Sequence, residues 1–155
     1  MYGFFSFFFS FFFFLIASKN GFSSYSAGTL SGLYLYPIKS CAALKITKGS
    51  WPLSKTSLKY DRQFAIMQGK STLTQKNESL LSQIQPEIDL KQEIMILSAP
   101  WQTSTCRLSL NRFSARSGSM ALCSGKVCGD IIEAHDCGDE VGDWLEDTLG
   151  EIIEG

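Results

Sequence analysis

The chain has 155 residues, five cysteines and a formal net charge of −1. This length accommodates one domain or two small ones. The near-neutral charge lacks the basic excess that marks most nucleic-acid-binding surfaces, so we expect no nucleic-acid partner. The cysteines are odd in number and irregularly spaced, which argues against a disulfide framework and favours a cytoplasmic location.

The N-terminal segment Met1–Ser18 is rich in phenylalanine and serine and has no charged residue. Its apolar stretch of about fourteen residues is short for a membrane-spanning helix and close to the core of a signal peptide. Three interpretations remain open: a signal peptide or signal anchor without its basic flank, a short membrane anchor that ends at Lys19, and a non-native translation of a pyrimidine-rich tract. In all three we expect the segment to lie outside the fold, with residues 19–29 as a Ser/Gly-rich linker.

From Leu30 onward the sequence becomes strand-like. The predicted strands are short, often β-branched or aromatic, and separated by turns, which is typical of a small meandering barrel or sandwich. They span Leu30–Tyr36, Ala43–Thr47, Leu58–Met67, Thr72–Gln75, Ile94–Ser98, Thr103–Leu110 and Lys126–Ala134.

Two helices are predicted. The first, Glu78–Gln85, has apolar residues at helical spacing and is ended by Pro86. The second, Asp136–Gly150, begins with acidic residues, which suit the positive end of a helix, and its apolar residues fall on one face. We expect this apolar face to lack a packing partner, so that Trp144 and Leu145 are exposed.

Basic residues lie next to two predicted strand ends. Pro37 has no amide N–H and fixes its own φ, so it ends the preceding strand. The chain then presents Lys39 and the hydroxyl of Ser40, while Arg62 lies just before the apolar run 64–67 of another strand. An ammonium, a hydroxyl and a guanidinium fork that converge from two strands are typical of a phosphate or small-anion site. The alternative is that these residues are ordinary solvated surface.

Cys123, Cys128 and Cys137, with His135 close by in the sequence, admit a zinc-site interpretation. Their spacing lacks the pair of cysteines separated by two residues that is typical of zinc knuckles. We therefore expect no metal here and interpret these positions as ordinary residues that precede the second helix.

An ordered series of short motifs resembles the N-terminal β-barrel region of MOSC proteins, a family named after the C-terminal part of molybdenum cofactor sulfurase. The motifs are Leu33–Ala43, Trp51-Pro52, Leu58–Arg62, Leu73–Lys76, Ile84–Leu90 and Ile94-Met95. The segment Val127–Gly150 resembles the start of the MOSC domain itself. The resemblance implies a mainly β, α+β fold with a barrel-like domain over residues 30–122 and the start of a truncated MOSC domain over residues 123–155.

Within this family the sequence is most similar to the molybdenum cofactor sulfurase branch, through the runs 40–43 and 84–86. Enzymes of that branch are transferases that take sulfur from L-cysteine as a persulfide in a pyridoxal-phosphate domain. Their MOSC part holds the molybdopterin cofactor that receives the sulfur, and this activates xanthine dehydrogenase and aldehyde oxidase. The resemblance therefore implies molybdenum cofactor (molybdopterin) as the ligand of this chain.

The resemblance also implies roles for individual residues. Lys39, Ser40 and Arg62 match family positions that contact the phosphate of the pterin, and they are the residues of the anion site inferred above. Thr74, with Gln75, is expected to line the same pocket. These are cofactor-binding roles, and no catalytic residue is assigned.

Three further motif positions, Asp61, Cys41 and Phe64, are not expected to contact the phosphate. Asp61 either orients Arg62 and its loop or caps a turn. Cys41 is expected to be a buried structural thiol. Phe64 replaces the tryptophan that is common two residues after the arginine, which keeps an aromatic side chain.

The motifs of the pyridoxal-phosphate domain and of the later MOSC half are absent from these 155 residues. We therefore expect a part of a longer protein that does not transfer sulfur alone. One alternative is an amidoxime-reducing MOSC oxidoreductase, similar to the mitochondrial proteins with an N-terminal anchor, which gives Met1–Ser18 a membrane role. Another is a small barrel that serves as an interaction module.

Overall fold

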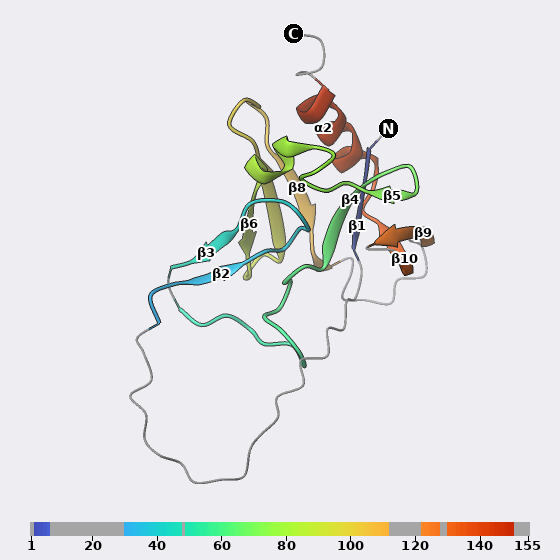
Figure 1. Ribbon diagram of the computed structural model, residues 1–155. Helices are drawn as coiled ribbons and strands as arrows, with labels where there is room; N and C mark the ends of the chain where they lie inside the picture. Colours follow the sequence, from blue (N-terminus) through green and yellow to red (C-terminus); the bar gives the residue numbers. More distant parts are fainter. Residues whose placement is uncertain (1, 7–29, 48, 112–121, 128–129, 151–155) are drawn as a thin grey trace.

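The computed structural model describes residues 2–6, 30–47, 49–111, 122–127 and 130–150, which form three β-sheets and two helical segments (Figure 1). A closed barrel has the strand order β1-β10-β9-β5-β4, β2 pairs with β3, and β6, β7 and β8 form a three-stranded sheet. The barrel strands are Tyr2–Ser6 (β1), Phe64–Gln68 (β4), Ser71–Thr72 (β5), Leu122–Val127 (β9) and Asp130–Asp136 (β10). The other strands are Leu33–Leu35 (β2), Leu44–Ile46 (β3), Gln85–Asp89 (β6), Ile94–Ser98 (β7) and Cys106–Ser109 (β8). The predicted mainly β, barrel-like fold is confirmed.

The strand β1 overturns one expectation from the sequence, because it makes part of Met1–Ser18 an element of the fold. Its five residues pair antiparallel with β4, from Tyr2 opposite Gln68 to Ser6 opposite Phe64. Phe5 and Ser6 also pair with the end of β10, which closes the barrel. Aromatic residues favour extended backbone, and β4 would otherwise present an unpaired edge on this side.

Residues 7–18 lie outside the described residues, as does the expected linker up to residue 29. Among the residues that the structure describes, no helix is both long enough and apolar enough to cross a membrane.

Several predicted strands are confirmed, but three regions differ from the prediction. Residues 58–62 form a turn before β4, because their conformation is set by contacts to other segments. The strand β6 contains Pro86, which is tolerated because β6 is the edge of its sheet. A single strand predicted over Lys126–Ala134 is in fact the hairpin β9–β10, in which Val127 pairs with Asp130. The glycine between Val127 and Asp130 is a turn signal in the sequence that the prediction missed.

The first predicted helix is a short 3-10 helix, Ser79–Gln83 (η1), in which the carboxylate of Glu78 accepts the Leu80 N–H at 3.1 Å. The second is the α-helix Asp139–Gly150 (α2), which lies close to β1 and β8 (Figure 1). The structure therefore confirms both helical regions, the first of them as one tight 3-10 turn.

The expectation that the apolar face of α2 lacks a partner is wrong. Trp144 is 7% exposed, and Leu145 is fully buried in the main hydrophobic cluster. Trp144 Nε1 donates to Ser104 O at 3.1 Å, and Trp101 Nε1 donates to Thr148 O at 2.8 Å. The segment that follows β7 supplies this partner, so the helix face is covered within the chain itself.

Candidate anion site

The segment after β2 is fastened to the start of β4. Ile38 forms a parallel bridge with Phe64, and the backbone bonds run both ways: Lys39 N donates to Phe64 O at 2.9 Å, and Phe64 N donates to Pro37 O at 3.1 Å. Pro37 and Ile38 are buried, whereas Lys39 and Ser40 are half-buried. The strand β2 ends at Leu35, one residue earlier than predicted, and Pro37 lies between this end and Lys39 and Ser40.

The turn 58–62 is interlocked with the same segment. Arg62 N donates to Tyr36 O at 2.7 Å, and Tyr36 N donates to the carboxylate oxygen Oδ1 of Asp61 at 3.0 Å, although 25 residues separate the two. The two sequence motifs therefore meet through a reciprocal pair of hydrogen bonds. Asp61 fixes this junction, which agrees with its expected role in orienting the loop of Arg62.

Both turns contain residues in the left-handed region. Among the described residues, four that are not glycine have a positive φ, and three of them belong to this site: Ser40 (70°), Tyr60 (73°) and Arg62 (49°). Such a conformation costs on the order of 1–3 kcal/mol for each residue and persists only where the surroundings hold it. Strained residues of this kind gather at ligand-binding positions, so their presence on the two turns is consistent with a binding site.

The neighbouring turn 74–77 contacts the site through Gln75. Gln75 Nε2 donates to Ser40 O at 3.0 Å. Thr74, which the resemblance assigns to the pocket, is half-buried, and its hydroxyl donates to Asn77 Oδ1 at 2.6 Å. The Thr74 proton is therefore used inside its own turn, and its role toward a ligand stays a prediction.

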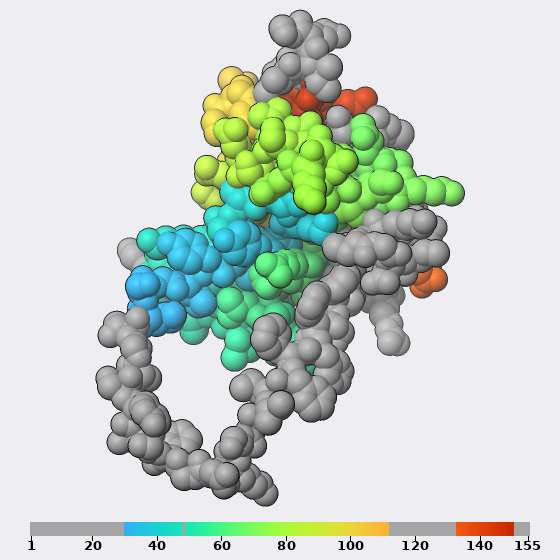
Figure 2. Space-filling model, in the orientation of Figure 1, coloured from blue at the N-terminus to red at the C-terminus, as the bar shows by residue number. Residues whose placement is uncertain are grey.

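Among the described residues, no carboxylate forms an ion pair with the positive charges of the site, Lys39 and Arg62. Arg62 is exposed, and the Asp61 carboxylate is already engaged by the Tyr36 N–H. In the space-filling view, the surface formed by residues 30–47 (blue to cyan) adjoins that of residues 49–62 (cyan to green) (Figure 2). The site therefore presents unpaired cationic groups where two turns meet.

Cys41 follows Ser40 in the chain, and its thiol is buried. It is 3% exposed, and burial raises the pKa of its thiol to about 12. Because the thiolate is the reactive form, this residue is not suited to nucleophilic or sulfur-carrying chemistry near neutral pH. The expected structural role of Cys41 agrees with its burial.

The zinc interpretation involves residues that the structure describes only in part. Cys128 lies outside the described residues, and the side-chain surroundings of Cys123 are not described either. Among the described residues, no group of three or more His, Cys, Asp and Glu side chains could hold a metal ion.

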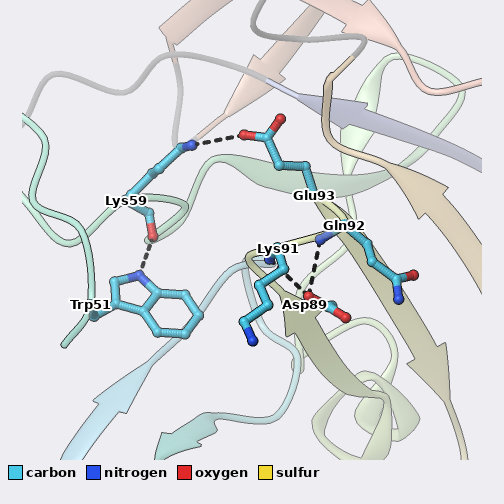
Figure 3. Close-up of polar contacts among 6 residues, drawn as sticks. All are labelled: Trp51, Lys59, Asp89, Lys91, Gln92 and Glu93. Atoms are coloured by element: carbon cyan, nitrogen blue, oxygen red, sulfur yellow. Dashed lines mark hydrogen bonds and ion pairs between the residues drawn. The ribbon is translucent and has the colours of Figure 1, made fainter. Parts of the chain in front are cut away.

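Sequence reasoning missed the residues that hold the turn of Arg62 from its other side (Figure 3). Trp51 Nε1 donates to Lys59 O at 2.8 Å, and Lys59 Nζ lies 3.3 Å from Glu93 Oε1. The same ammonium lies 4.7 Å from the centroid of the Tyr60 ring. The pKa of Lys59 is raised, first by the neighbouring Tyr60 side chain and then by Glu93, with burial opposing both. No local pattern links Lys59 with a residue 34 positions away.

The fold agrees with the comparison with known families. The family model described as "MOSC N-terminal beta barrel domain" matches residues 27–152. The chain belongs to this family. No solved structure matches the chain significantly.

Curated relatives are named molybdenum cofactor sulfurase, so the resemblance to that branch is confirmed. The protein of Drosophila mojavensis is 44% identical over 127 residues, which is 79% of this chain and 15% of the relative. The protein of Bombyx mori is 40% identical over 121 residues, covering 77% and 15% respectively. The human protein is 36% identical over 138 residues, covering 83% and 15%. The chain thus spans about 15% of the length of these relatives.

Proposed function

We propose that this chain is a molybdenum-cofactor-binding segment of a molybdenum cofactor sulfurase. In this proposal Lys39, Ser40 and Arg62 hold the phosphate of molybdopterin, and Thr74 lines the same pocket. The observation that carries the proposal is the interlocking of the two motif turns, which holds Lys39 and Arg62 on neighbouring backbone segments.

The residues present fit a phosphate group. A phosphate is recognised by a guanidinium fork, an ammonium and hydroxyl or backbone N–H donors. Arg62 and Lys39 supply positive charge that no carboxylate of the described residues pairs with, and the Ser40 hydroxyl supplies a donor beside them. Asp61 is the nearest acid in sequence, and its hydrogen bond from Tyr36 N gives it a task other than pairing with Arg62.

The molybdenum cofactor, when bound, supplies the metal centre that receives a terminal sulfido ligand. The residues of this chain bind and orient its phosphate end. Removal of sulfur from L-cysteine with pyridoxal phosphate would belong to other regions of the full-length relatives, as would contacts with xanthine dehydrogenase and aldehyde oxidase. The buried thiol of Cys41 is no candidate for the persulfide carrier, because burial keeps it protonated. A cytoplasmic location accords with this role.

The proposal is tested by molybdopterin retention in the full chain with Lys39→Ala and Arg62→Ala together. Loss of a bidentate arginine–phosphate contact costs about 1.5–3 kcal/mol, so affinity is expected to fall roughly ten- to a hundredfold. A matched control is Lys91→Ala with Arg107→Ala, which removes the same charge from exposed positions on other turns and strands. Retention that is undiminished in the first variant, or equally diminished in both, would exclude Lys39 and Arg62 as the phosphate site.

A further inference from the structure

Building on the proposed function, we propose that Glu93 is a positioning residue for anion binding. Its carboxylate holds the Lys59 side chain (Figure 3). Lys59 in turn holds the left-handed turn that presents Arg62. Glu93 lies at the far end of the turn between β6 and β7, a different sheet from the one that Arg62 precedes. Anion affinity would therefore depend on the ion pair between Lys59 and Glu93, although neither residue contacts the anion.

The turn needs such a support because its conformation is unfavourable on its own. Tyr60 and Arg62 have φ values of 73° and 49°, and neither is a glycine. A left-handed residue with a side chain costs energy that the surrounding contacts must offset. The link between Asp61 and Tyr36 supports the turn from one side only.

Lys59 supports the turn from the other side through four separate contacts. Its N–H donates to Pro52 O at 2.8 Å, and its carbonyl accepts the indole N–H of Trp51 at 2.8 Å. Its ammonium lies 3.3 Å from Glu93 Oε1 and over the ring of Tyr60. Lys59 is thus bonded at both backbone groups and at the end of its side chain.

Glu93 is itself held firmly, which makes it a suitable anchor. Its carbonyl accepts the Leu110 N–H at 2.7 Å. The turn before it is closed by Asp89 Oδ1, which accepts the N–H groups of Lys91 and Gln92 at 2.8 and 3.1 Å (Figure 3). Because Glu93 is fixed to the β6–β7–β8 sheet, its carboxylate restrains the Lys59 side chain relative to that sheet.

The expected size of the effect follows from exposure. The side chains of Lys59 and Glu93 are 36% and 33% exposed, so solvent screens their attraction and the ion pair is a modest one. Without it the turn spends less time in the binding-competent conformation, and the apparent affinity falls by the same fraction. We expect Glu93→Gln to weaken anion binding about two- to fivefold.

The direction in which Glu93→Gln changes anion affinity distinguishes a positioning role of Glu93 from a direct effect of its charge. Removal of a negative charge near an anion site strengthens anion binding through space. A positioning role predicts the opposite, namely weaker binding in Glu93→Gln. Glu87→Gln is the matched control, because it neutralises an exposed carboxylate on β6.

The test is calorimetric titration of the full chain with inorganic pyrophosphate at fixed ionic strength. Glu93→Gln is expected to weaken binding in the presence of Arg62 and to have no effect in the Arg62→Ala background. The charge-reversed pair Lys59→Glu with Glu93→Lys is expected to recover most of the affinity, which a general loss of structure would not do.

The outcomes distinguish the two proposals. If Arg62→Ala binds pyrophosphate as well as the unchanged chain does, the anion site itself is wrong. If Arg62→Ala loses affinity while Glu93→Gln binds equally well or more tightly, the anion site stands and the positioning role of Glu93 is refuted. An equal loss from Glu93→Gln with and without Arg62 also refutes it, because the effect then does not pass through Arg62.

Discussion

The hydrogen bond between Asp61 and Tyr36 gives a prediction in which two substitutions at one position separate geometry from charge. Asp61 Oδ1 accepts the Tyr36 N–H at 3.0 Å, and Arg62 N returns a bond to Tyr36 O at 2.7 Å. Asp61→Asn keeps an oxygen acceptor of the same shape and removes the negative charge. Asp61→Ala removes both the acceptor and the charge.

The magnitude follows from the chemistry of this bond. A hydrogen bond to a charged acceptor is worth about 1.5–3 kcal/mol in buried surroundings, but this one is exposed, so we expect about 1 kcal/mol from its loss. In a chain of this size that lowers the melting temperature by about 2–4 °C. Anion affinity is expected to be highest in Asp61→Asn, intermediate in the unchanged chain and lowest in Asp61→Ala. The asparagine removes a negative charge and keeps the turn of Arg62 in place, whereas the alanine releases this turn.

The assay combines thermal unfolding with a pyrophosphate titration of the full chain. The reasoning fails if Asp61→Ala and Asp61→Asn unfold at the same temperature and bind pyrophosphate alike. That outcome would mean that the negative charge, and not the tie to Tyr36, determines what Asp61 does at this site.

Two further predictions concern a buried thiol and the first strand. Because burial raises the pKa of Cys41 to about 12 from 9.0, the unfolded chain loses this proton first, so stability present below pH 9 is lost as pH rises toward 12. The free energy of unfolding in urea should decline between pH 9 and 11, and less steeply in Cys41→Ala. For one proton the two slopes differ by up to about 1.4 kcal/mol per pH unit. Equal slopes would contradict the raised pKa of Cys41. In β1, Phe4→Pro is expected to cost about 1–3 kcal/mol and to speed amide hydrogen exchange at Ile66, its partner in β4, while Phe4→Val leaves exchange nearly unchanged. Unaltered exchange in the proline variant would show that β1 does not secure β4.

The sequence predicted those features that depend on local chemistry. Pro37 ends a strand because it lacks a donor, and Ile94–Ser98 is a strand with the predicted bounds because it is a short apolar run closed by Ala99 and Pro100. The amphipathic helix before Gly150 follows from its periodicity. In each case the signal lies within a few residues of the feature.

Features set by distant contacts gave no such signal. The turn at Tyr60 and Arg62 was predicted as strand, since neither residue favours a positive φ and the bonds that impose it come from Tyr36 and Trp51. The burial of Trp144 depends on an acceptor 40 residues earlier, which periodicity cannot reveal. Glu93 contacts Lys59 across 34 positions of the chain, so no local pattern links it to the site.

The candidate site combines features set by local chemistry with features set by distant contacts. Its chemical groups, Lys39, Ser40 and Arg62, are predictable from residue type and from their places beside strand ends. Their convergence depends on long-range bonds: the parallel bridge of Ile38 with Phe64, and the reciprocal bonds of Tyr36 with the 58–62 turn. The binding groups thus lie on turns that contain residues with a positive φ, and hydrogen bonds between the two segments hold these turns in place. Anion affinity should therefore respond to substitutions at the supports, and the comparison of Asp61→Ala with Asp61→Asn and of Glu93→Gln with Glu87→Gln measures how strongly.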